Sequence, residues 1–224
     1  MLFSSHGSQP IRAQVYEAMK QQIIELKYFP GQALSENEMA TQFQVSRTPI
    51  RESFVRLSQE GLVQVIPQKG TFVSLINTAL VDEARFMRMK LELAIVEEAC
   101  NYFPITSMKE LELNLLEQKR YLEQDDVEKA FSLDQHFHFT LFNGVEKQHI
   151  WKTMNILTMH LDRCRRLRLL DNHHWQHLYN EHLFIFESIK NKDCDAAKSM
   201  MKTHLSSSIH DIEILKQKYP NYFN

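Results

Sequence analysis

Apolar residues recur every three or four positions in the first part of the chain, which is the spacing of one face of a helix. Val15, Met19 and Ile23 mark this face, in a segment that begins near Ile11. Pro30 ends the pattern, because a proline inside a helix removes a hydrogen bond and clashes with the preceding turn. The pattern therefore predicts a first amphipathic helix.

Two further helices are predicted, each with a serine at its start. Ser35 and Glu38 form an S-x-x-E capping box, in which each side chain can satisfy an otherwise unpaired backbone N–H. Ser46 is placed to cap the third helix, and Pro49 falls in the first turn, where a missing N–H costs little. Gly61 can end this helix in the left-handed conformation.

The pattern then changes from helix to strand. Residues 62–66 and 71–75 are rich in strand-forming side chains, and Pro-Gln-Lys-Gly at 67–70 predicts a turn between them. Three short helices followed by a two-stranded hairpin are the order of a winged helix-turn-helix, which we place at residues 10–76. Residues 1–9 are polar and lack periodicity, so we expect a flexible N-terminus.

Helical spacing resumes near residue 79 and continues to about residue 220. Five breaks in the spacing predict about six helices; they lie at residues 103–104, 124–126, 143–144, 171–172 and 192–193. The predicted fold class is therefore mainly α. It combines an N-terminal winged helix-turn-helix carrying a hairpin wing with a C-terminal all-α antiparallel bundle.

The composition is that of an ordinary globular protein and excludes several other classes. Hydrophobic residues make up 43% of the 224 residues and charged residues 24%, as in ordinary globular proteins. No segment has the apolar length of a signal peptide or membrane span, so we expect a cytoplasmic protein without membrane contact. Cys100, Cys164 and Cys194 are widely spaced, which excludes a CxxC zinc or thiol-exchange motif.

The net charge of −2 does not by itself indicate a nucleic-acid partner, so that hypothesis depends on where basic residues lie. Arg47 and Arg51 are four residues apart on the third predicted helix, with Thr48 beside them, opposite its apolar face. Lys69 lies in the hairpin turn. Such side chains can reach base edges and phosphates. The alternative is that the two arginines form an ordinary solvated helix face.

Ten of the eleven histidines lie in the predicted helical domain, which raises the question of a metal. Asp134 and His138 are four apart and share one helix face. His182 and His204 lie on the next-to-last and last predicted helices, which a short turn makes antiparallel neighbours. Carboxylate and imidazole groups suit a divalent ion such as Zn²⁺, Ni²⁺ or Mn²⁺. The alternative is a hydrogen-bonded polar cluster without an ion.

Residues 24–73 resemble the GntR family of bacterial transcription regulators. The matching segments are Pro30-Gly31, Leu34 to Ala40, Val45 to Glu52, Glu60 to Val63 and Gly70 to Val73. The DNA-contacting residues that this resemblance implies are Asn37, Ser46, Arg47, Thr48, Arg51, Gln68, Lys69 and Gly70. Asn37 departs from the family, many members of which have a basic residue there, so the resemblance implies a weaker amide contact at this position.

Residues 78–210 resemble the C-terminal FCD domain of the FadR branch of this family. Arg88-x-x-x-Glu92 and Asp134-x-x-x-His138 match its polar positions, and the expected six helices are closer to the VanR-type subgroup. The metal ligands that the resemblance implies are Asp134, His138, His182 and His204. It also implies a small carboxylate effector, an organic or sugar acid, contacted by Arg88. The alternative role of Arg88 is an ion pair with Glu92 on the same helix.

These observations lead us to expect a homodimeric regulator that binds double-stranded operator DNA and is not an enzyme. Residues 79–220 would then form the effector-binding and dimerisation domain. A metal-dependent enzyme is an alternative, because three histidines and a carboxylate can activate water, but no separate general acid or base is identifiable. A DNA-binding architectural protein that senses no ligand is another.

Overall fold

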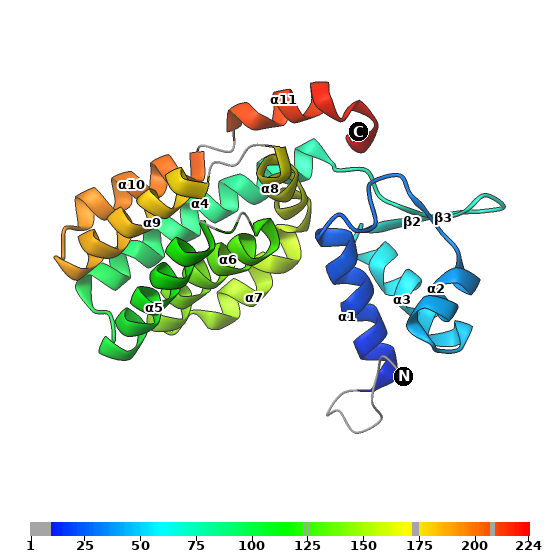
Figure 1. Ribbon diagram of the computed structural model, residues 1–224, viewed down its shortest axis with the longest axis horizontal. Coiled ribbons are helices and arrows are strands. Elements are labelled where there is room, and N and C mark those ends of the chain that lie inside the picture. Colours follow the sequence, from blue (N-terminus) through cyan, green and yellow to red (C-terminus); the bar gives the residue numbers. More distant parts are fainter. Residues whose placement is uncertain (1–9, 123, 125, 172–174, 207–208) are drawn as a thin grey trace. The chain divides into compact units, whose positions relative to one another are not determined.

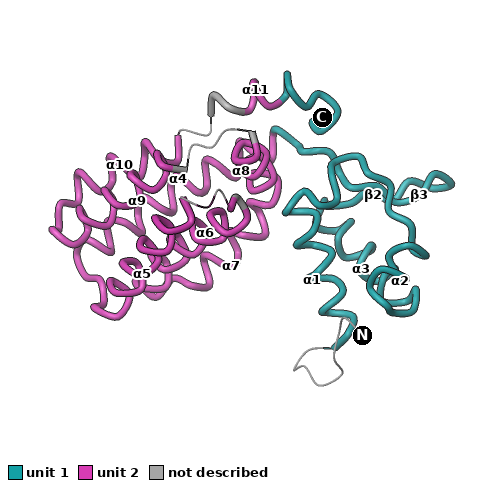
Figure 2. The backbone as a smooth tube through the Cα atoms, viewed as in Figure 1, with its two compact units in different colours: residues 1–78, 216–224 teal, residues 79–215 magenta. Residues whose placement is uncertain are grey.

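The computed structural model describes residues 10–224, except residues 123, 125, 172–174 and 207–208 (Figure 1). The flexible N-terminus predicted at residues 1–9 lies outside the described residues. The chain divides into two compact units (Figure 2). The first unit combines the residues up to Thr78 with Lys216–Asn224, and the second is Ala79–Leu215.

The first unit contains three helices and a small sheet. Its elements are α1 (Ile11–Ile24), β1 (Ala33–Leu34), α2 (Glu36–Phe43), α3 (Arg47–Gln59), β2 (Val63–Ile66) and β3 (Gly70–Val73). The strands are antiparallel in the order β1-β3-β2, and Ile66 lies opposite Gly70 at the hairpin end. The predicted winged helix-turn-helix is confirmed. The pattern missed β1, because two residues are too few to show alternation.

The ends of the helices in this unit follow local sequence. The Ser35 hydroxyl accepts a hydrogen bond from the backbone N–H of Glu38 at 3.5 Å and so starts α2. Ser46 occupies the N-cap position of α3, but it makes no side-chain capping hydrogen bond. Gly61 follows α3 with φ of 75°, a left-handed conformation that glycine adopts without strain.

The core of this unit lies between α1 and α3, which pack against each other. Met19 and Ile23 of α1 and Ile50 and Leu57 of α3 are fully buried. Burial of this apolar face is the main stabilising contribution to such a small unit. It also leaves the opposite face of α3 exposed to solvent.

The end of the chain packs against the first unit. Ile76 forms a parallel bridge with Phe223, and its backbone N–H donates to the carbonyl of Tyr222 at 2.8 Å. The ring of Tyr222 stacks on Phe29 with centroids 6.3 Å apart. The sequence pattern assigned residues up to 220 to the helical domain. The structure instead groups Lys216–Asn224 with the first unit, where Phe223 is buried.

Helices are the only regular secondary structure in the described residues of the second unit. Its helices are α4 (Thr78–Asn101), α5 (Ile105–Leu122), α6 (Val127–Gly144), α7 (Gln148–Leu157), α8 (Met159–Asp171), α9 (Trp175–Lys190) and α10 (Cys194–Ser206); α11 (Ile209–Lys218) follows, and Pro220–Tyr222 is a short 3-10 turn. The predicted mainly α fold class is confirmed. The expected count of about six helices is wrong, because eight α-helices occur among the described residues after Asn77.

One missed helix boundary has an identifiable cause. The break between α7 and α8 falls at Thr158, whose hydroxyl donates to Asp162 Oδ2 at 3.1 Å. No glycine or proline lies there, so the sequence offers none of the usual stop signals.

Several helices contribute side chains to one shared core in the second unit. α5 contacts both α6 and α9, and α9 packs beside α10. Val96, Leu111, Phe137, Ile185 and Met201 are buried together there. Every helix in the described part of the chain is too short or too polar to cross a membrane. This core fixes α6, α9 and α10 relative to one another, and these three helices carry the predicted metal ligands.

Candidate metal centre and DNA-binding face

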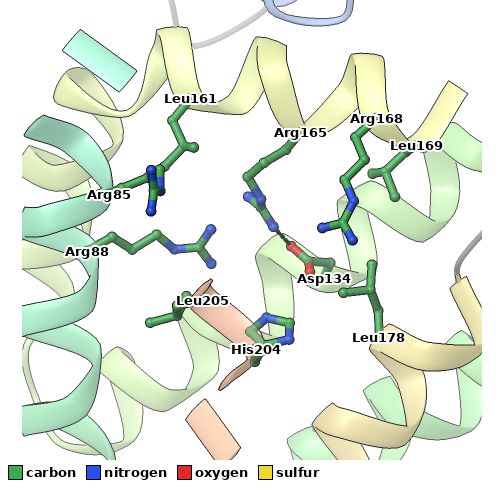
Figure 3. Close-up of a pocket in the computed structure, with 10 residues that line it drawn as sticks. All are labelled: Arg85, Arg88, Asp134, Leu161, Arg165, Arg168, Leu169, Leu178, His204 and Leu205. Atoms are coloured by element: carbon green, nitrogen blue, oxygen red, sulfur yellow. Dashed lines mark hydrogen bonds and ion pairs between the residues drawn. The ribbon is translucent and has the colours of Figure 1, made fainter. Parts of the chain in front are cut away.

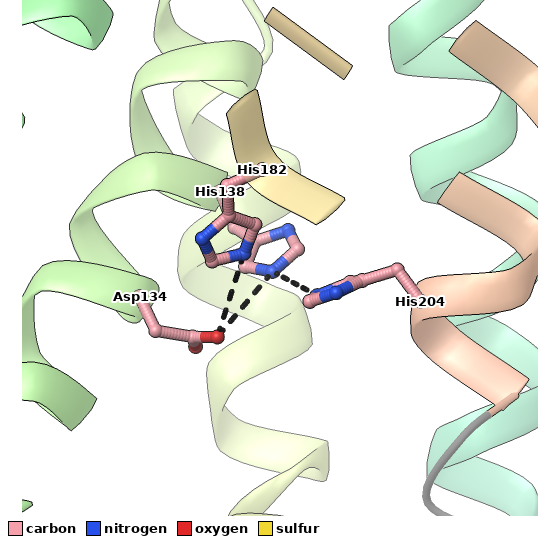
Figure 4. A group of neighbouring side chains, drawn as sticks. All are labelled: Asp134, His138, His182 and His204. Carbon is pink, nitrogen blue, oxygen red and sulfur yellow. Dashed lines mark hydrogen bonds and ion pairs between the residues drawn. The ribbon is translucent and has the colours of Figure 1, made fainter. Parts of the chain in front are cut away.

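Four buried side chains from three helices converge in the second unit (Figure 4). Asp134 and His138 lie one turn apart on α6, His182 lies on α9 and His204 on α10. Each side chain offers one ligand atom, and the four atoms lie within 4.8 Å of one another. The structure thus brings together the four residues that the sequence analysis nominated as metal ligands.

The separations of these atoms match a shared ion. His138 Nε2 lies 3.2 Å from His204 Nε2, and His182 Nε2 lies 3.6 Å from Asp134 Oδ1. His138 Nε2 and Asp134 Oδ1 are 4.0 Å apart. Ligands bound at about 2.1 Å lie roughly 3.0 to 3.4 Å apart around an octahedral or tetrahedral ion. The shorter separations already approach this range, and the wider ones, up to 4.8 Å, must shorten for all four atoms to bind one ion.

An oxygen acceptor lies close to the other ring nitrogen of each histidine. His138 Nδ1 lies 2.5 Å from Glu92 Oε2, and His204 Nδ1 lies 2.8 Å from Glu181 Oε2. His182 Nδ1 lies 3.0 Å from Gln118 Oε1. An amide or carboxylate oxygen can only accept, so each contact favours the tautomer that carries its proton on Nδ1. The Nε2 lone pairs then face the centre, as in histidines that bind metals.

The orientation of Gln118 is itself determined by neighbours. Its Nε2 donates to Asn114 Oδ1 at 2.7 Å, and the Asn114 amide donates to the carbonyl of Leu133 at 3.0 Å. The Gln118 amide therefore cannot flip without breaking this chain of buried hydrogen bonds. Its oxygen is held toward His182, which fixes the tautomer of that ligand.

The donor set fits a cation better than a self-contained polar cluster. Asp134 Oδ1 and His182 Nε2 are buried and make no hydrogen bond among the described residues. With their protons on Nδ1, His138 and His204 direct two lone pairs at each other across 3.2 Å. Facing acceptors in a buried site are unfavourable unless a proton or a cation lies between them.

Burial also keeps protons off this centre. It lowers the pKa of His138 to about 4, although the Glu92 carboxylate opposes the shift, and it holds the pKa of His182 well below its usual value. Burial alone would raise the pKa of Asp134, but the ion pair of its Oδ2 with Arg165 holds that pKa below its usual value. At neutral pH His138 and His182 are therefore neutral and Asp134 is ionised.

A small pocket of about 40 Å³ adjoins this centre (Figure 3). Asp134 and His204 line it together with four arginines and four leucines, namely Arg85, Arg88, Arg165, Arg168, Leu161, Leu169, Leu178 and Leu205. Arg88, the predicted ligand contact, is buried and pairs through Nε with Glu92. Its Nη2 is buried without a hydrogen-bond partner among the described residues. Arg88 thus pairs with Glu92 on its own helix and also carries one guanidinium nitrogen without a partner in the described part of the chain.

The residues nominated for DNA contact are all exposed in the first unit; they are Asn37, Ser46, Arg47, Thr48, Arg51, Gln68, Lys69 and Gly70. Arg51 donates to both carboxylate oxygens of Glu36, at 3.0 and 2.9 Å. Arg47 donates to Asn37 Oδ1 at 3.3 Å. These exposed contacts hold both arginines at the start of α3, where DNA can replace their partners at small cost.

The wing ends in a tight turn. The backbone N–H of Lys69 donates to the carbonyl of Ile66 at 3.0 Å, so Pro67 and Gln68 occupy the centre of the turn. Gln68 has φ of 64° and Gly70 has φ of 116°. A side chain is unfavourable at the φ of Gly70, so glycine there lets the hairpin close and leaves Gln68 and Lys69 exposed.

Several residues of the metal centre and its pocket were not identified from sequence. Gln118 gave no signal, because an isolated glutamine on an amphipathic helix resembles a surface residue. Arg165 and Arg168 belong to a run of four arginines within six residues of α8. This clustering is visible in the sequence and is the signal by which both could have been identified. Both are lining residues of the pocket, and Arg165 is the partner of Asp134.

Both parts of the chain match known protein families. Residues 11–73 match the family described as bacterial regulatory proteins, gntR family, and residues 83–207 match the FCD domain. The solved structure of Escherichia coli McbR/YncC has the same fold, with a TM-score of 0.79, 21% identity, and coverage of 94% of this chain and 99% of that one.

Two curated relatives span nearly the whole chain. An HTH-type transcriptional regulator from an unstable DNA locus of Streptomyces ambofaciens is 38% identical over 95% of this chain and 89% of its own length. The HTH-type transcriptional repressor RspR of Escherichia coli is 31% identical over 97% of this chain and 95% of its own length. These relatives are regulators and not enzymes. The chain therefore belongs to the gntR family of bacterial transcription regulators, with an FCD domain following its DNA-binding domain.

Proposed function

We propose that this regulator binds a specific operator and that a small carboxylate, bound beside a divalent ion, changes its affinity for that DNA. One observation carries the proposal: Arg88 lines the same pocket as Asp134 and His204. A guanidinium and an open metal position facing one small cavity provide two points of attachment for one carboxylate.

The proposed ion is Zn²⁺, Ni²⁺ or Mn²⁺, held by Asp134, His138, His182 and His204. Three neutral imidazoles and one carboxylate give a ligand set of charge −1, which suits a divalent cation. The ion, when bound, supplies a Lewis-acidic point at which an effector carboxylate can coordinate. The protein positions the imidazoles through Glu92, Gln118 and Glu181, whose contacts with Nδ1 orient the rings.

On the DNA side, we propose that Arg47 and Arg51 contact the operator in the major groove. Asn37, Ser46 and Thr48 would support them at the phosphates, and the wing residues Gln68, Lys69 and Gly70 would approach the adjacent groove. Support comes from the exposure of all eight residues and from the position of the arginines in the first two turns of α3.

We expect the protein to be a homodimer that binds an approximately palindromic operator, with the FCD domain supplying the dimer contact. One winged domain covers too few base pairs for tight selectivity, and a two-fold dimer doubles the contacted sequence. Sedimentation at micromolar concentration and the stoichiometry of DNA binding check this. A strict monomer that binds DNA one to one would contradict it.

The proposed function is tested by selecting a binding sequence from random DNA and measuring affinity for it by fluorescence anisotropy. The titration is run with Zn²⁺-loaded and with chelated protein, each with and without lactate, gluconate, malate or citrate. We expect at least one acid to shift the dissociation constant of the Zn²⁺-loaded protein, with a smaller shift after chelation. Sequence-specific binding that none of these acids alters under any condition would support an architectural DNA-binding protein instead.

A further inference from the structure

The pocket beside the candidate metal centre is unusually rich in arginine. Arg85 and Arg88 reach it from α4, and Arg165 and Arg168 reach it from α8 (Figure 3). Arg85 and Arg88 are three residues apart, so both lie on the pocket-facing side of α4. The guanidinium of Arg88 points toward the space above His204, whereas that of Arg85 lies farther from the centre, beside Leu161.

The hydrogen-bonding capacity of these arginines is only partly used. Arg165 pairs with Asp134 and with Asp162, at 3.1 Å from the latter. Arg88 pairs with Glu92 through Nε, but its Nη2 is buried without a hydrogen-bond partner among the described residues. Arg85 donates from Nη1 to Asp82 at 3.0 Å, yet its Nε is likewise buried and unpaired within the described chain.

Two arginines that line one pocket from α4 therefore each carry a buried guanidinium nitrogen without a hydrogen-bond partner among the described residues. An unmade hydrogen bond from a buried charged group is costly, so each donor favours a ligand that brings an acceptor. Arg85 begins about one helical turn before Arg88, a rise of roughly 4.5 Å along α4. A single carboxylate that coordinates the ion and accepts from Arg88 leaves the donor of Arg85 unsatisfied.

On the basis of the proposed function, we propose that the effector carries two acidic groups and that Arg85 is the residue that selects for the second. One carboxylate lies at the ion and Arg88 Nη2. The second acidic group, a carboxylate or a phosphate, accepts from Arg85 Nε. The carbon chain between them lies near Leu161 and Leu205, which line the same side of the pocket.

The charges around Arg85 are consistent with this assignment. Asp82, the carboxylate that pairs with Arg85, has a side chain that is 67% exposed, so water screens it and it competes weakly for the guanidinium. Other carboxylates near the pocket are already engaged: Glu92 by Arg88 and His138, and Asp134 and Asp162 by Arg165.

The test compares malate with 2-hydroxybutyrate, which keeps the hydroxy acid but has a methyl group in place of the second carboxylate. Calorimetric titrations use Zn²⁺-loaded and chelated wild-type protein, Arg85→Gln and the control Lys90→Gln. Lys90→Gln removes one exposed positive charge from the same helix. We expect the wild type and the control to bind malate at least about tenfold more tightly than 2-hydroxybutyrate, the effect of one charge-assisted hydrogen bond.

Arg85→Gln is expected to remove most of this preference while leaving the affinity for 2-hydroxybutyrate within about twofold. Asp82→Asn, which removes the competing carboxylate and keeps Arg85, is expected to increase the preference. If the wild type bound the two acids equally, the proposal of a second acidic group would be wrong, but the proposed function would not be affected. A preference that survives in Arg85→Gln would overturn the role of Arg85. Binding of neither acid by Zn²⁺-loaded wild type would count against the carboxylate site itself.

Discussion

Chelation of the bound ion is expected to lower the melting temperature of the wild-type protein by roughly 8 to 16 °C. An ion that binds only the folded state stabilises it by about 4 kcal/mol when its free concentration is 1,000 times the dissociation constant. For a chain of 150 to 250 residues, each kcal/mol corresponds to about 2 to 4 °C. Thermal unfolding, measured with Zn²⁺ and then with excess EDTA, checks this value.

The matched variants are His182→Ala and His136→Ala. His182 is fully buried at the centre, whereas the His136 side chain is 42% exposed and contacts Glu110. His182→Ala is expected to lose most of the difference between the Zn²⁺ and EDTA melting temperatures. His136→Ala, on the same helix as two of the proposed ligands, should retain it.

Elemental analysis of both variants gives a second measure that does not depend on their stability. We expect about one ion per chain in the wild type and in His136→Ala, and much less in His182→Ala. A wild type that gains no ion from Zn²⁺-containing buffer, and melts at the same temperature with EDTA, would show that the four side chains form a polar cluster only.

The second large effect is expected at the DNA-binding face. Arg47→Ala and Arg51→Ala each remove a guanidinium that can pair bidentately with a base. Each should therefore weaken binding to the selected operator by about 1 to 3 kcal/mol, or roughly 5- to 150-fold. Because both side chains are exposed, the melting temperature should change little. Anisotropy titrations in one fixed buffer measure the effect, since such affinities depend steeply on salt.

Two controls separate base reading from general charge. Arg12→Ala removes an exposed arginine of α1 from the same unit and should change operator affinity little. Lys69→Ala, in the wing turn, should mainly reduce the slope of affinity against salt concentration, as expected for a phosphate contact. If operator affinity were unchanged in both Arg47→Ala and Arg51→Ala, α3 would not be the helix that contacts the operator bases.

Glu36 adds a feature to this face that the sequence analysis did not include. Its carboxylate accepts two hydrogen bonds from Arg51, and the same contact lowers the pKa of Glu36 below its usual value. The pair is exposed, so it orients the guanidinium at little cost to an incoming operator. DNA binding by Arg51 thus begins from an ordered side chain.

The sequence by itself determined those features that depend on neighbouring residues along the chain. Helical spacing located α1, the serine at position 35 marked the start of α2, and Gly61 marked the end of α3, since caps and periodicity are local properties. The pairing of Asp134 with His138 is of the same kind, because residues four apart on a helix share a face.

The tertiary structure decided the features that join distant segments. It packs α9 and α10 beside α6, which brings His182 and His204 to within 4.8 Å of the first pair of ligand atoms. It also places Glu92 and Gln118 behind two of the imidazoles, from α4 and α5. Sequence spacing carries no information on such contacts, because they depend on how helix faces pack against one another and not on the period within any helix.

The same distinction explains what the pattern missed at both ends of the helical region. Lys216–Asn224 groups with the first unit because Phe223 is buried beside Ile76, a residue far from it in the sequence. Arg85 and Arg165 enter one pocket because α4 and α8 both border it, although neither helix shows this in its own sequence. Local chemistry therefore determined the elements and the types of ligand, and packing determined which of those side chains meet.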